Sequence, residues 1–199
     1  MPTILKTTLT ALTLFSLFSC ASRLTPQQGI PEISLAGYQS LINEKTQRTE
    51  VYEGISNILT IQATWLDSQV TDGALSHTAR LAQWNEQTYK DEREKRINEN
   101  AESTRFFVSF FTPEKKYSDL ARLKSLWKVF LEVNGQRYEG KAVRVKQSLS
   151  EIQVMYPFHN RWSTPYIITF PIATALVENK AATLTFTGAY ASTQLHFGK

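Results

Sequence analysis

Residues 126–145, LWKVFLEVNGQRYEGKAVRV, constrain the fold of this chain more than any other stretch. Apolar side chains occupy every second position from Trp127 to Val133, which is the period of a strand with one buried face. Asn134-Gly135 follows, and this dipeptide readily adopts the positive φ values of a tight hairpin turn. A return strand that carries Tyr138, Ala142, Val143 and Val145 is expected to pair with the first. The stretch therefore predicts an antiparallel β protein.

Further segments are also predicted to be strands. Residues 57–65 alternate apolar with polar side chains, and residues 104–112, TRFFVSFFT, carry phenylalanines on both faces, as a central strand covered on both sides does. Short strands are expected at 151–156, 166–172, 183–190 and 193–197. Seven or eight strands with frequent turn residues predict a mainly β fold, an Ig-like antiparallel β-sandwich.

Residues 67–100 predict a helix inserted into this sandwich. They contain no proline and only one glycine, Gly73, and they include the mixed-charge run KDEREKR at 90–96. Charges of alternating sign are typical of a solvated helix face, which we favour over a docking surface. Asp67 is expected to cap the start of the helix.

The amino terminus has the pattern of a targeting segment. Residues 9–18, LTALTLFSLF, form an apolar run too short to span a bilayer, which takes about 20 residues, but long enough for a signal-peptide core. It ends in Leu17-Phe18-Ser19-Cys20, which is similar to the lipobox of bacterial lipoproteins. The resemblance implies a diacylglycerol thioether on Cys20, cleavage before it and acylation of the new amino terminus. The residue after the cysteine is Ala21 and not aspartate. In lipoproteins of the kind that this motif resembles, this implies transport to the outer membrane, where the protein would lie at the periplasmic face.

These features together predict the domain organisation. Residues 1–19 are expected to be a lipoprotein signal peptide, residues 20–50 the lipidated cysteine and a tether, and residues 51–199 a single β-sandwich domain with a helical insertion at about 67–100. Pro26, Gly29 and Pro31 favour the tether. The layout resembles uncharacterised small lipoproteins with a β-sandwich domain, and that resemblance carries no catalytic motif.

No pattern of catalytic, metal-ligating or cofactor-binding residues is present in the sequence. The single cysteine excludes an internal disulfide, and the histidines at 77, 159 and 196 lack metal-ligand spacing. There is no nucleophile elbow, phosphate loop or dinucleotide fingerprint. The 22 basic and 18 acidic residues form no basic stripe, so nucleic acid is not an expected partner. We expect a protein that is not an enzyme and has no cofactor or metal.

Residues 156–166, YPFHNRWSTPY, are the one stretch that favours a binding site. Phe158, His159, Arg161 and Trp162 are of the types found in loops that contact a ligand or partner. The alternative, which we favour on the sequence, is that Phe158 and Trp162 plug the open end of the sandwich while Asn160 makes the turn. Exposure of the two aromatic rings distinguishes these interpretations.

The sequence thus predicts a non-catalytic protein attached to the lipid bilayer through acylated Cys20. It would act by contact with another envelope protein at the periplasmic face of the bacterial outer membrane. The alternative is a β-sandwich that binds a glycan or peptide through the 156–166 loop.

The lipid anchor depends on one sulfur atom. Cys20→Ser removes the atom that forms the thioether, so the variant should remain an unlipidated precursor. Metabolic labelling with a fatty-acid analogue should mark the parent chain and not the variant, and equal labelling of both would contradict the lipoprotein prediction.

Overall fold

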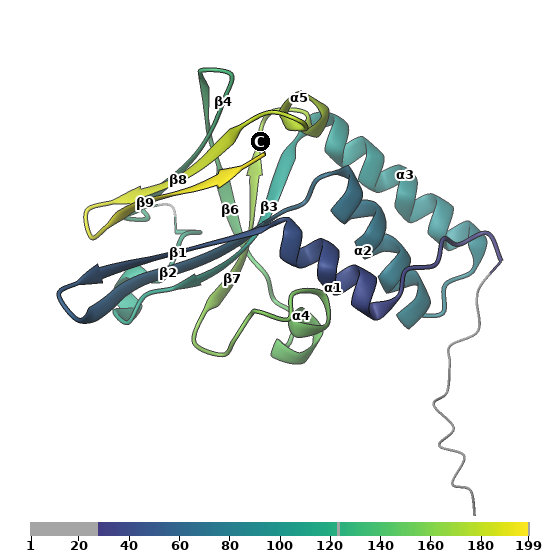
Figure 1. The fold of residues 1–199 in the computed structure, drawn as a ribbon, viewed down its shortest axis with the longest axis horizontal. Coiled ribbons are helices and arrows are strands. Elements are labelled where there is room, and N and C mark those ends of the chain that lie inside the picture. Colours follow the sequence, from purple (N-terminus) through teal and green to yellow (C-terminus); the bar gives the residue numbers. More distant parts are fainter. Residues whose placement is uncertain (1–27, 123, 199) are drawn as a thin grey trace, which may run out of the picture.

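The computed structural model describes residues 28–122 and 124–198. Two antiparallel sheets face each other as a sandwich, and helices lie to one side of it (Figure 1). The five-stranded sheet has the order β1 (Thr46–Glu53), β2 (Ser56–Trp65), β3 (Thr104–Phe111), β7 (Thr164–Phe170), β6 (Lys141–Arg144). The four-stranded sheet has the order β5 (Gln136–Glu139), β4 (Trp127–Val133), β8 (Ala182–Gly188), β9 (Ser192–Phe197). The helices are α1 (Leu35–Glu44), α2 (Ser68–Leu81), α3 (Glu86–Glu102), α4 (Leu149–Met155) and α5 (Thr174–Val177), with a 3-10 turn, η1, at Lys115–Tyr117.

The core between the sheets follows the alternation predicted for β4. Trp127, Val129, Leu131 and Val133 are each at most 4% exposed and face the inner side of the five-stranded sheet. Burial of each such side chain contributes about 1.5–3 kcal/mol to the free energy of unfolding. The indole Nε1 of Trp127 donates to the carbonyl oxygen of Tyr117 at 2.7 Å, so its polar atom is satisfied.

Strand β3 is covered on both faces, as its phenylalanines predicted. Phe106 and Phe110 are buried in the core between the sheets. Phe107 points to the outer face, where the ring of Tyr156 stacks on it with centroids 3.6 Å apart. The residue that stacks on Phe107 therefore comes from the segment after α4 and not from the helical insertion.

The predicted hairpin is correct in its turn and wrong in its second half. Asn134 and Gly135 have φ values of 51° and 75°, and β5 pairs with β4 as expected. At Gly140 the chain leaves the four-stranded sheet, and residues 141–144 form β6, which pairs with β7 of the other sheet. A Cβ atom at Gly140 would lie 2.5 Å from the Cε1 atom of Phe170. Only glycine lets the backbone pass so close to the core.

The fold contains more helix than the sequence indicated, so it is mixed α/β and not mainly β. The insertion is two helices, because Gln83 takes a positive φ of 51° and Asn85 caps a new helix by accepting from the Thr88 amide at 2.8 Å. The predicted cap at the start of α2 is present, since Asp67 Oδ1 accepts from the Val70 amide at 2.8 Å.

Two further boundaries differ from those predicted. The expected strand at 151–156 is wrong, because Ser148 and Glu151 form a capping box that starts α4. The folded domain also begins before residue 51. Helix α1 and most of β1 lie in the region assigned to the tether, and Tyr38 and Ile42 of α1 are fully buried. Cys20 and residues 1–19 lie outside the described residues.

The outer face of the five-stranded sheet is where the helices gather. Tyr38 and Ile42 of α1 pack with Val70 of α2, and Tyr156 and Phe158 from the segment after α4 join the same apolar cluster. Helix α3 runs beside α2, farther from the sheets (Figure 1). The segment between α4 and β7 is therefore held against the sheet by a second, smaller core.

Gly140 gives a test of the crossing between the sheets. Gly140→Ala places a methyl group against Phe170 and Ile168, and overpacking of this kind should lower the free energy of unfolding by about 1–3 kcal/mol. Gly37→Ala is the control, because it adds a methyl group in α1 near only Ser34 and Ile33, and helices favour alanine over glycine. Equal denaturation midpoints for Gly140→Ala and the parent chain would contradict the close passage.

Candidate functional site

The loop between α4 and β7 presents its four predicted contact residues in different ways. The side chain of Trp162 is 76% exposed, and Arg161 is also exposed. Phe158 is half-buried with its ring 6.0 Å from that of Phe107, whereas His159 is only 3% exposed. The favoured plug interpretation is therefore wrong for Trp162, and Phe158 is the aromatic residue that packs on the domain.

Side-chain hydrogen bonds hold this loop in one shape. The side-chain oxygen of Asn160 accepts from the amides of Trp162 and Ser163 at 2.9 and 3.2 Å, so Asn160 makes the turn, as the sequence suggested. Gln153 of α4 donates to the carbonyl oxygen of His159 at 2.9 Å. Trp162 thus projects from a fixed loop into solvent.

His159 anchors the loop to the central strand. Its Nδ1 atom lies 2.8 Å from the hydroxyl of Ser109 on β3, and burial lowers the pKa of the imidazole below its ordinary value. A serine beside a histidine is also the pairing of a nucleophile with its base. Ser109 is only 1% exposed, however, so a substrate carbonyl cannot approach its hydroxyl. We interpret this pair as a structural link.

A hollow of about 590 Å³ lies beside Trp162, and we call it the Trp162 hollow. Its lining comes from β1, β2, β3 and the loop, and consists of Arg48, Thr60, Gln62, Phe111, Phe158, Asn160, Trp162 and Ser163. Thr60 and Gln62 belong to the polar face of the alternating segment 57–65. That alternation indicates that these two side chains lie on the outer face of the sheet. Arg48 was not predicted from the sequence, because this residue falls in the region assigned to the tether.

Arg48 brings a positive charge to the hollow. Its Nε atom donates to Glu50 at 2.9 Å, and the Tyr52 hydroxyl donates to the other oxygen of that carboxylate at 2.7 Å. The hydrogen bonds from Tyr52 and then from Arg48 lower the pKa of Glu50, and the ion pair with this carboxylate orients the guanidinium.

The lining of the Trp162 hollow suits recognition of a polar ligand. An exposed indole face offers a flat apolar surface, and the amides of Gln62 and Asn160 with the guanidinium of Arg48 offer hydrogen bonds around it. Within residues 28–122 and 124–198, no group of three or more His, Cys, Asp or Glu side chains could hold a metal ion.

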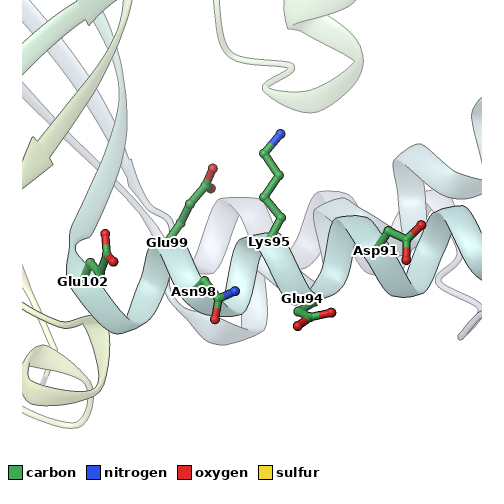
Figure 2. A pocket seen from close by; sticks show the side chains of 6 residues that line it. All are labelled: Asp91, Glu94, Lys95, Asn98, Glu99 and Glu102. Carbon is green, nitrogen blue, oxygen red and sulfur yellow. The ribbon is translucent and has the colours of Figure 1, made fainter.

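A second polar surface lies along α3, but it does not form a site. Asp91, Glu94, Lys95, Asn98, Glu99 and Glu102 border a shallow depression there. Figure 2 shows that these side chains leave the helix in several directions and do not converge on one point. This surface is the solvated helix face that the mixed charges predicted.

No family model matches the chain, and no curated protein and no solved structure is detectably similar to it. In the part of the chain that the structure describes, no helix has the length and apolar character needed to cross a bilayer.

The buried histidines should make the stability of the fold depend on pH. Burial is the main cause that lowers the pKa of both His159 and His77. These two imidazoles therefore stay neutral in the folded chain at a pH where they bind protons in the unfolded chain. The free energy of unfolding should therefore decrease as the pH falls from about 7 to about 5, through the ordinary histidine pKa near 6.5.

Thermal melting across this pH range measures the effect. His159→Gln should give a shallower decrease of the melting temperature than the parent chain, whereas His196→Gln, at an exposed position on β9, should leave the slope unchanged. The same slope for His159→Gln and the parent chain would exclude His159 as a source of the pH dependence.

Proposed function

We propose that this chain is a non-catalytic, lipid-anchored protein of the bacterial cell envelope that contacts another envelope component through the surface around Trp162. The supporting observation is a tryptophan side chain 76% exposed beside a hollow of about 590 Å³. A tryptophan buries about 150–250 Å² when it is covered, and such residues dominate the binding energy of interfaces.

The rigidity of the loop supports this role. Ordering a side chain or loop at an interface costs about 0.5–1.5 kcal/mol for each immobilised side chain. The Asn160 turn and the link between His159 and Ser109 fix the loop before any partner arrives. Less of the binding free energy is therefore lost to ordering the loop when the partner associates.

The proposed anchor is the diacylglycerol-modified Cys20 at the periplasmic face of the outer membrane. Several acyl chains give stable attachment, at about 0.8 kcal/mol for each buried methylene. Seven residues separate Cys20 from Gln28, where the described fold begins, and the eight Cα–Cα steps between the two reach at most about 28 Å. The domain would therefore work close to the lipid surface. We include in the proposal that its sandwich is of the Ig-like kind.

A glycan is the second candidate for the contacted component. The specific observation that favours it is that Gln62, Asn160 and Arg48 line the same hollow as the exposed indole of Trp162. A sugar ring can stack on the indole while its hydroxyls exchange hydrogen bonds with amide and guanidinium groups. A glycan strand of the envelope would meet both conditions.

Trp162→Ala tests the contact surface. In intact envelopes, chemical crosslinking of the parent chain should trap a partner, and in purified form the chain should cosediment with peptidoglycan sacculi if the component is a glycan. Trp162→Ala should abolish whichever interaction is found and leave the melting temperature within about a degree, because the ring fills no core.

Leu176→Ala is the matched control, because it also truncates an exposed apolar side chain but lies on α5, outside the Trp162 hollow. Retention of crosslinks and of cosedimentation by Trp162→Ala would overturn the proposed contact surface. A large drop in its melting temperature would show instead that the ring is structural.

A further inference from the structure

A second hollow lies on the same outer face of the five-stranded sheet, and we call it the arginine groove. Tyr156 lines the arginine groove, whereas Phe158, two residues later, lines the Trp162 hollow. The groove has a volume of about 370 Å³, at the small end of the range of about 300–1,000 Å³ for ligand sites. This volume accommodates a ligand with one extended hydrocarbon chain but not a ligand with two.

The walls of the arginine groove are apolar along most of its length. The side chains that form them come from the segment before α2, from α2, from α4 and from the outer face of β3 and β7, and include Leu66, Val70, Ala74, Met155, Phe107 and Ile167. An apolar lining of this kind is typical of ligand-binding clefts.

The two threonine hydroxyls in these walls already have partners within the chain. Thr71 Oγ1 accepts from the Asn100 amide at 3.3 Å, and Thr78 Oγ1 lies 3.8 Å from the sulfur of Met155. An extended peptide in the groove would need acceptors and donors for its own backbone, and burial without them costs free energy. An occupant without polar groups along its body fits better.

Positive charge enters the groove through Arg96 of α3 and Arg105 of β3. These are the two charged residues among the described lining, which contains no carboxylate. Glu99 accepts from Arg96 Nη1 at 2.8 Å and from Arg105 Nη1 at 2.5 Å, and Glu92 lies 4.0 Å from Arg96. Both carboxylates belong to α3 and do not line the groove.

The two guanidinium groups retain unused donors. Each has five N–H groups. Apart from its bonds to Glu99 and Asn100, Arg105 has a buried Nε atom for which the described residues offer no partner. The phenol of Tyr156 is a further donor, because its ordinary pKa of about 10 keeps it protonated at neutral pH and burial raises that pKa further.

We propose that the arginine groove binds a single-chain fatty acid, with its carboxylate at Arg96 and Arg105 and its acyl chain along the apolar wall. An occupant with one anionic end and an apolar body matches both the charge and the lining of the groove. This proposal concerns a different hollow from the Trp162 surface and does not depend on the function proposed there.

Fluorescence with dansylaminoundecanoic acid measures this binding directly. The chain from residue 20 with Cys20→Ser contains every residue of the three apolar clusters, which lie between Ile30 and Phe197, and it needs no detergent. Saturable blue-shifted emission is expected. Dodecanoic acid should displace the probe about tenfold better than dodecanol, because a charge-assisted hydrogen bond is lost with the alcohol. Octanoic acid should bind more weakly than dodecanoic acid, by about fourfold for each missing buried methylene.

Three variants identify the groove as the site. Arg96→Gln should bind dodecanoic acid about tenfold more weakly and lose the preference over dodecanol. Arg93→Gln, which removes the same charge from the same helix outside the groove, should bind as the parent chain does. Ala74→Phe fills the groove and should abolish binding of acid and alcohol alike, with the fold checked by circular dichroism.

Several results would overturn the proposal. They are the absence of a saturable change in probe emission, equal displacement of the probe by dodecanoic acid and dodecanol, and equal binding of dodecanoic acid by Arg96→Gln and Arg93→Gln. Displacement of the probe by an amphipathic peptide of leucine and glutamate but not by dodecanoic acid would assign the groove to a protein partner. A dimer in size-exclusion chromatography that Ala74→Phe converts to a monomer but Arg93→Gln does not would assign it to a second copy of the chain.

Discussion

Phe106 and Phe107 are adjacent in the chain but are buried in two different cores. The ring of Phe106 packs edge-on against Phe197 of the four-stranded sheet, with centroids 5.1 Å apart, and lies in the core between the sheets. The ring of Phe107 lies beneath Tyr156 on the opposite face. Because successive side chains of a strand point to opposite faces, β3 must be covered twice, and the helical side of the molecule supplies the second cover.

This constraint also positions both hollows. The segment after α4 crosses the outer face of β3, where Tyr156 and Phe158 pack near Phe107 with centroid distances of 3.6 and 6.0 Å. The aromatic residues divide the remaining outer face, with a polar hollow toward β1 and β2 and an apolar groove toward α2 and α3. The two surfaces therefore share one wall, and a displacement of this segment would alter both.

Local patterns predicted the parts of the fold that depend on neighbouring residues. The period of two in β2, β3 and β4, the turn at Asn134-Gly135 and the cap at Asp67 each follow from a few adjacent side chains. The break before α3 and the start of α4 were local too, but their caps at Asn85 and Ser148 were overlooked. The exposure of Trp162 was not predictable in this way, because it depends on where His159 meets Ser109, fifty residues away in the chain. The arginine groove likewise joins distant residues that carry no shared motif.

The passage of the backbone at Gly140 has a mechanical consequence. Strands β5 and β6 belong to opposite sheets and are separated by this single residue. At the opposite edge of the sandwich, β1 lies near β9, and the hydroxyls of Thr49 and Thr193 are 2.8 Å apart. A covalent connection thus joins the two layers at one edge, and a hydrogen bond joins them at the other. Shear between the layers is resisted on both sides, so a force applied through one end of the chain would load both sheets together.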